Sequence, residues 1–190
     1  MFSRRASVFR AIARPFWRCR IVAMIGVAMI GVAATACTPA APPPAPAWWQ
    51  QAVPVGWQNQ MLAQVNAYRA LHGDSPVVMC SRLQTAAETL TNDEAAHNFI
   101  GHTGSDGSTT TSRVTATGYL SLPDAWGIGE NTAGGQVDVT QVMSEWEASP
   151  EHNANLLNPA MTGGGFAEAT TAAGIIHRFW TQDFGYGGVC

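Results

Sequence analysis

The chain has 190 residues and a formal net charge of −3, but its charges are unevenly placed: six of its ten basic residues are arginines within the first twenty positions. The rest of the chain carries four arginines, no lysine and thirteen acidic residues, so its net charge is near −9. Because such a surface repels phosphate backbones, we do not expect the protein to bind nucleic acid.

The first 36 residues have the parts of a secretory signal peptide. The arginine-rich start is followed by sixteen uncharged residues, 21–36, which end in small side chains. This stretch is shorter than the ~20 residues that cross a bilayer as a helix. We therefore predict a signal peptide over residues 1–36, and a permanent N-terminal anchor helix is the alternative.

Residues 37–56 are predicted to be a tether. The sequence at 34–37 resembles a bacterial lipobox, in which Cys37 becomes the lipidated first residue of the mature protein. Release after ordinary signal-peptide cleavage is the alternative, so we expect either a lipoprotein of the cell membrane or a secreted protein. The proline- and alanine-rich sequence that follows favours an extended spacer. Trp48 and Trp49 would lie either at the membrane interface or in the first packing of the domain.

Residues 57–190 have the length of one domain, with helices mostly before strands. Apolar spacing and helix-end signals predict four helices, over residues 58–71, 81–99, 110–117 and 137–149. Ser81 is the predicted cap of the second helix, and a further helical turn is expected after the fourth helix, over 152–157. β-branched and aromatic runs predict three strands, over residues 126–132, 163–169 and 175–184. A turn at 170–174 joins the last two strands. This order indicates an α+β fold, with helices packed around an antiparallel sheet.

Two cysteines remain in the mature domain, Cys80 and Cys190. In an extracytoplasmic protein such a pair predicts one disulfide, which would close a loop of about 110 residues and contribute about 2–4 kcal/mol. The last residue of a chain is otherwise a poor place for core packing, which favours the bridge. Two separate buried thiols are the alternative.

Four segments place polar residues with useful chemistry beside glycine-rich or aromatic chain. His102 lies in the glycine-rich stretch 101–108, and Glu130 lies in a Gly-Glu-Asn triplet. His152 lies in a segment that starts at Trp146. The fourth segment is 179–185, which ends in Thr-Gln-Asp-Phe-Gly.

In this order and spacing, the four segments resemble the CAP superfamily (cysteine-rich secretory proteins, antigen 5 and plant pathogenesis-related proteins), in its bacterial branch. Residues 66–69 also resemble the first helix of the family, so the resemblance covers nearly all of the predicted domain at 57–190. It implies a three-layer α-β-α sandwich with a central antiparallel sheet. It also implies a cleft with two histidines and two glutamates, which holds a divalent cation in some members.

Residue by residue, the resemblance assigns His102, Glu130 and His152 to this cleft. The second glutamate of the family is replaced here by Ser149. Two imidazoles and one carboxylate suit Zn²⁺ or another divalent cation, although no cofactor is required. The alternatives are structural: His102 pins its loop, His152 caps a helix end, and Glu130 is satisfied by backbone N–H groups or by Arg113.

A binding module needs only a cleft with a few fixed polar groups, whereas a hydrolase needs an activated nucleophile. Ser149 is three residues from His152, but Pro150 after it indicates a helix end. We therefore favour a binding function over catalysis. The prediction is an exported, lipid-anchored monomer that binds a lipid or other small extracellular ligand, with a peptidase or cell-wall hydrolase as the alternative.

Overall fold

One sheet forms the centre of the fold. In residues 47–120 and 125–190, which the computed structural model describes, four strands lie in the order β1-β3-β4-β2. The strands are β1 (Val78–Met79), β2 (Gly127–Gly134), β3 (Gly163–Thr170) and β4 (Arg178–Tyr186). β4 pairs antiparallel with β2 and β3, whereas β1 pairs parallel with β3. The sheet is therefore mixed rather than wholly antiparallel, because the two-residue β1 is too short for its pattern to show in the sequence.

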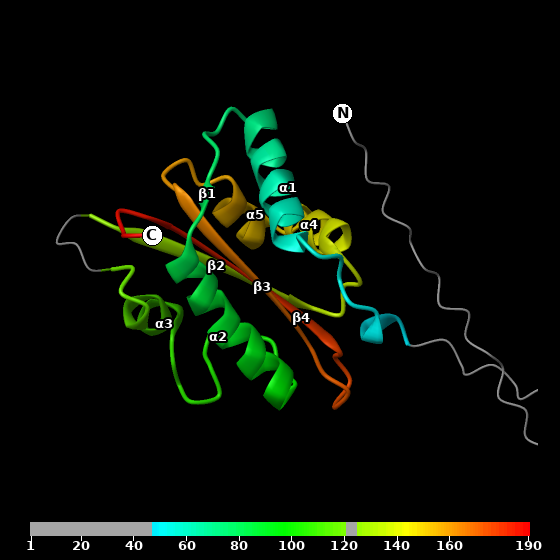
Figure 1. The fold of residues 1–190 in the computed structure, drawn as a ribbon. Helices are drawn as coiled ribbons and strands as arrows, with labels where there is room; N and C mark the ends of the chain where they lie inside the picture. Colours follow the sequence, from blue (N-terminus) through cyan, green and yellow to red (C-terminus); the bar gives the residue numbers. More distant parts are fainter. Residues whose placement is uncertain (1–46, 121–124) are drawn as a thin grey trace, which may run out of the picture. The chain divides into compact units, whose positions relative to one another are not determined.

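Helices cover both faces of this sheet, as Figure 1 shows. On one face lie α1 (Trp57–Leu71), α4 (Val139–Ala148) and α5 (Pro150–Leu156). On the other lie α2 (Ser81–His97) and α3 (Thr110–Ala116). A short 3₁₀ turn, η1 (Trp48–Gln50), precedes α1. The predicted three-layer α-β-α arrangement is confirmed.

The helix predicted over 137–149 and the further turn after it are two separate helices. Ser149 has an extended backbone, with φ −93° and ψ 120°, and it both ends α4 and precedes α5. Pro150 takes the first position of α5, where its missing N–H leaves no donor unpaired. This break places His152 on α5, which packs against β2.

α2 lies directly against β3 because Gly165 has no side chain. A Cβ at Gly165 would stand 2.6 Å from the Cα of Gln84. The N-cap of α2 is Cys80 rather than the predicted Ser81, whose hydroxyl instead donates to the carbonyl of Cys190.

β4 begins at Arg178, three residues later than predicted. Asn98, which follows α2 in a left-handed conformation, explains the difference. Its side-chain oxygen accepts the backbone N–H groups of Ile175 and Ile176, which a β-ladder would otherwise use.

The core lies between the sheet and the helices, and it includes Trp146, Trp180 and Phe184. The predicted disulfide joins Cys80 to Cys190 across 110 residues. Residues 46–190 form a compact unit that holds the sheet, the core and the disulfide, so this unit has what a domain needs to fold by itself.

The predicted signal peptide and Cys37 lie outside the described residues. Among the helices of 47–120 and 125–190, none is long and apolar enough to cross a membrane.

Candidate functional site

His102 and Glu130 form a hydrogen-bonded pair. His102 lies in the loop between α2 and α3, and Glu130 lies in the middle of β2. The two are joined by a contact of 2.8 Å from His102 Nδ1 to Glu130 Oε1. The His102 side chain is 57% exposed and that of Glu130 is 2% exposed. Because an ionised carboxylate only accepts, Nδ1 carries the hydrogen, and Nε2 is left as the ring nitrogen that a ligand can meet.

Arg113, on α3, holds Glu130 from the other side. Its Nη2 lies 2.8 Å from Glu130 Oε2, and both side chains are buried. Thr110 donates its hydroxyl to Glu130 Oε1 at 2.9 Å. Arg113 also donates to the carbonyl groups of His102 and Ser108, which fixes the loop that carries the imidazole. Arg113 therefore satisfies Glu130, as one of the structural alternatives expected, and it also fixes the loop. These contacts orient the His102 ring and leave it exposed to solvent.

His152 is brought to the same place by α5. Asn155 donates to the carbonyl of Glu130 at 3.0 Å, and Asn131 donates to the carbonyl of His152 at 3.2 Å. Burial lowers the pKa of His152, and the charge of His102 lowers it further. His102 and Glu130 are thus in direct contact, and the backbone of His152 is held next to β2 by the two asparagines; a common cleft for all three side chains stays a prediction.

Two buried acids of this region were not predicted as site residues. Asp183, on β4, is the cross-strand partner of Glu130, and none of the hydrogen bonds found among the described residues reaches its carboxyl oxygens. Burial, and then the charge of Glu130, raise the pKa of Asp183 well above its usual range. Burial and the neighbouring charge of Glu130 therefore both favour the neutral form of the Asp183 carboxyl. Antiparallel register creates this pairing, and no local sequence signal gives it.

Glu94 is the second missed acid, on the sheet-facing side of α2. Its Oε1 accepts from the Thr132 hydroxyl at 2.5 Å and from the Gly101 N–H at 3.2 Å, next to His102. Burial raises the pKa of Glu94 to about 7, against the lowering effect of these hydrogen bonds. Its position four residues after Leu90 on the apolar face of the predicted helix was the available signal.

These residues do not fit a three-ligand metal centre in this arrangement. Glu130 accepts from Arg113, Thr110 and His102, so a cation would have to displace a guanidinium from its carboxylate. Within the described part of the chain, no group of three or more His, Cys, Asp and Glu side chains is placed to hold a metal ion. Two imidazoles remain as nitrogen donors, and metal binding stays a prediction.

Ser149 has the geometry of a helix boundary. Its backbone N–H bonds to Glu145 and Trp146 at the end of α4. Between residues 125 and 190 no hydrogen bond links its hydroxyl to His152, so the structure offers no serine–histidine pair at this position.

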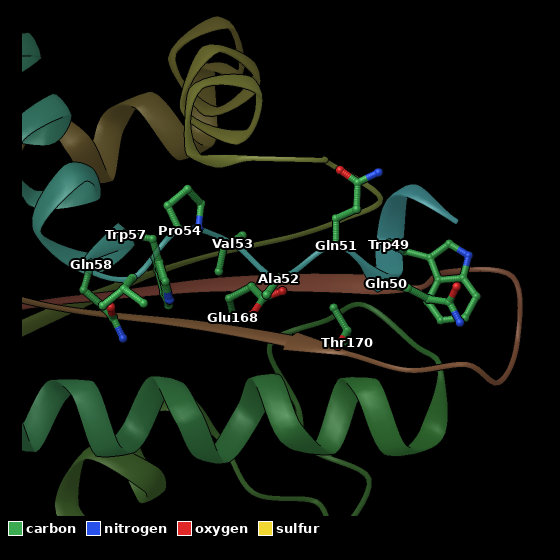
Figure 2. A pocket seen from close by; sticks show the side chains of 12 residues that line it. Trp49, Gln50, Gln51, Ala52, Val53, Pro54, Trp57, Gln58, Glu168 and Thr170 are labelled. Carbon is green, nitrogen blue, oxygen red and sulfur yellow. The ribbon is translucent and has the colours of Figure 1, made fainter. Parts of the chain in front are cut away.

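A separate cavity of about 420 Å³ lies between residues 49–58 and β3. Figure 2 shows Glu168 and Thr170 projecting from β3 toward this segment. None of the three predicted cleft residues lines it, so it is distinct from the His102–Glu130 pair.

The sequence pattern of the cysteine-rich secretory protein family, CAP, matches residues 62–184. No curated protein matches the chain. Three solved structures resemble it. An extracellular protein containing an SCP domain from Bacillus anthracis has a TM-score of 0.56 and 24% sequence identity. An outer surface protein from Borrelia burgdorferi has a TM-score of 0.60 and 18% identity, and a cysteine-rich secretory protein from Staphylococcus aureus has a TM-score of 0.50 and 18% identity.

These similarities cover 66%, 70% and 69% of this chain, in the same order. They cover 39% of the Bacillus protein, 93% of the Borrelia protein and 40% of the Staphylococcus protein, so this chain matches about two fifths of two of them. At these identities the likeness concerns the fold.

Proposed function

Because the chain belongs to the cysteine-rich secretory protein (CAP) family of extracellular proteins, we propose that it is an extracytoplasmic binding module whose ligand meets His102 and His152. The observation that supports this most is the asymmetry of the His102–Glu130 pair. An exposed imidazole is fixed by a buried carboxylate, which is itself fixed by Arg113. A ring held in this way loses little freedom when a ligand binds, which favours affinity.

The charges around the site favour a neutral ligand. The lowered pKa of His152 keeps its ring uncharged near neutral pH, and Arg113 is already paired with Glu130. With a net charge near −9 beyond the arginine-rich start, the domain also repels anions. Uncharged imidazole nitrogens accept hydrogen bonds, so we propose a lipid or other small molecule with a hydroxyl-bearing, uncharged polar group.

A fluorescent monoacylglycerol analogue tests this proposal. We expect His102→Ala to raise the dissociation constant of the purified protein for this probe at least tenfold. His97→Ala is a matched control, because His97 is also 57% exposed and lies 2.8 Å from a carboxylate, that of Asp93. The control should change the constant less than twofold. Equal constants for the wild type and both variants would contradict the proposed site.

A hydrolase is the second candidate, and one feature favours it. A carboxylate that holds a histidine by Nδ1 leaves Nε2 able to take a proton from a water molecule. Casein and peptidoglycan are the substrates to assay, with wild type and His102→Ala side by side. Turnover by the wild type that disappears in the variant would establish catalysis and overturn the preference for binding alone.

The attachment to the membrane rests on the sequence. We propose that the chain is held at the outer side of the cell membrane by a lipid on Cys37. Mass spectrometry of the native N-terminus should show Cys37 as the first residue with added acyl mass. A mature N-terminus without acyl mass would mean that the protein is released.

A further inference from the structure

One end of the domain carries several exposed apolar side chains. There β2 and β3 end, β4 begins, and Asn98 after α2 ties down the β3–β4 turn through the backbone of Ile175 and Ile176. The turn, residues 171–177, contains no acidic residue, arginine or lysine. Figure 1 shows the turn, the end of α2 and η1 gathered at the lower right of the domain.

Large apolar side chains are exposed at this end. Ile175, at the tip of the turn, is 92% exposed. Three others are also exposed to solvent, and they lie beside Arg178 or Ile176: Trp48, Val137 and Ile100. We call these four residues, together with the turn 171–177, the apolar end. Exposed apolar side chains grouped at one end of an acidic domain form a candidate contact surface.

The N-terminal part of the domain is fastened to the same end. Arg178 is buried and donates to the backbone carbonyl groups of Trp49, Gln51 and Val137. The Trp49 ring stacks on that of His177, with 4.6 Å between centroids. From there the chain runs along β3 toward α1, as the labelled residues of Figure 2 show. The polypeptide therefore enters the domain at its apolar end.

The sequence before this point limits which surface can approach a membrane. Nine residues, 38–46, separate Cys37 from the first described residue, so even a fully extended chain places the two no more than about 36 Å apart. If Cys37 is held at the bilayer, the end of the domain where the chain enters is the part that reaches the surface first. This step rests on the membrane attachment proposed above.

We propose that the apolar end of the domain rests on the bilayer, with Ile175 and Trp48 in its interfacial layer. Tryptophan is favoured at that depth, and a single lipid chain binds a membrane only marginally unless a second contact adds to it. The lipid surface that fits is uncharged, because the exposed Asp138 lies next to Val137 and the domain as a whole is acidic.

Cysteine labelling of the full chain in phosphatidylcholine vesicles tests this proposal. The variants are Ile175→Cys and Leu71→Cys, whose parent side chains are 92% and 84% exposed and which therefore form a matched pair. A membrane-impermeant maleimide is added, and the labelling of the parent chain is subtracted. We expect position 71 to react at least five times faster than position 175. In the isolated unit of residues 46–190, without vesicles, the two positions should react at rates within twofold.

Equal rates at both positions in vesicles would overturn the proposal, as would a full chain that does not stay with the vesicles. These outcomes are independent of the monoacylglycerol experiment, which probes His102 and not the apolar end. A failed ligand test and a failed membrane test can therefore be told apart.

Discussion

At the scale of single residues, Glu130 depends on Arg113, because the two form a buried ion pair beside a second carboxyl, that of Asp183. Removing the guanidinium leaves a buried charge without its partner. We expect Arg113→Met to lower the free energy of unfolding by about 3–5 kcal/mol, measured by urea denaturation. Arg82→Met is the control, since Arg82 is only partly buried and donates to the Gly118 carbonyl; it should cost about 1 kcal/mol. Equal losses of unfolding free energy in the two variants would show that the Arg113–Glu130 pair stabilises the fold no more than the Arg82 hydrogen bond does.

We expect the stability of the domain to depend on pH through Glu94. Its pKa is raised from 4.5 to about 7 in the folded state, so between these values the folded protein binds more protons than the unfolded chain. The contribution of Glu94 to the free energy of unfolding therefore falls by about 3 kcal/mol as the pH rises from 4.5 to 7. We expect Glu94→Gln to remove this fall, as seen by urea denaturation at pH 5 and pH 8.

The difference in unfolding free energy between the wild type and Glu94→Gln reports the effect of Glu94 alone, because Asp183 and His152 are present in both proteins. The raised pKa of Asp183 acts in the same direction as that of Glu94, and the lowered pKa of His152 acts in the opposite direction. Two curves that run parallel over pH would contradict the assignment.

Motif spacing led us to propose His102, Glu130 and His152, since those residues stand in segments whose order is specific. It could not give the roles of Glu94 and Asp183. Their effect on the site comes from the pairing of β2 with β4 and from the packing of α2 on the sheet, which are non-local. The hydrogen bonds that saturate Glu130 were likewise beyond sequence reasoning, although Arg113 was named as one candidate partner.

At the scale of elements, the close approach of α2 to β3 depends on Gly165. A methyl group there would press on the backbone of Gln84 and Leu83, which cannot move without lifting the helix. We expect Gly165→Ala to cost about 3 kcal/mol, at the upper end for overpacking, by thermal or urea unfolding. Gly163→Ala on the same strand is the control, because its Cβ would meet its nearest atoms at 3.4 Å. A control as damaging as the test variant would mean that the contact is not specific.

The helices were predicted well where an apolar stripe is long, as in α1 and α2. The break between α4 and α5 was visible only as Pro150, and its consequence, a turn that brings His152 to β2, required the packing of α5. The start of β4 was misplaced because the N–H groups of Ile175 and Ile176 go to Asn98, 77 residues away for Ile175. A β-branched run does not reveal such a distant acceptor.

At the scale of the whole molecule, the disulfide ties the C-terminus to the start of α2. It closes a loop of 110 residues, so we expect its reduction to lower the free energy of unfolding by about 2–4 kcal/mol. Urea denaturation with and without dithiothreitol measures this. A double variant, Cys80→Ser with Cys190→Ser, should show the lowered stability under both conditions and no response to the reductant. A wild-type stability unchanged by reduction would contradict the prediction.

The α-β-α arrangement could be predicted because the order of helices and strands and the family resemblance agreed. The apolar end could not, since Trp48, Ile100, Val137 and Ile175 come from four separate segments. Only the folded arrangement brings them to the end at which the polypeptide enters the domain. Glu130, which holds the His102 ring, thus lies in the middle of β2, and the apolar end lies at the end of the same sheet.

The central claim is that buried Glu130 fixes the exposed His102 ring with the hydrogen on Nδ1 and leaves Nε2 for a ligand. ¹⁵N NMR of the histidine side chains measures this most directly. At a pH where the ring is neutral, the His102 signals should report the Nδ1–H tautomer in the wild type, and Glu130→Ala should lose that preference. A His102 ring that is mainly the Nε2–H tautomer in the wild type would contradict the account.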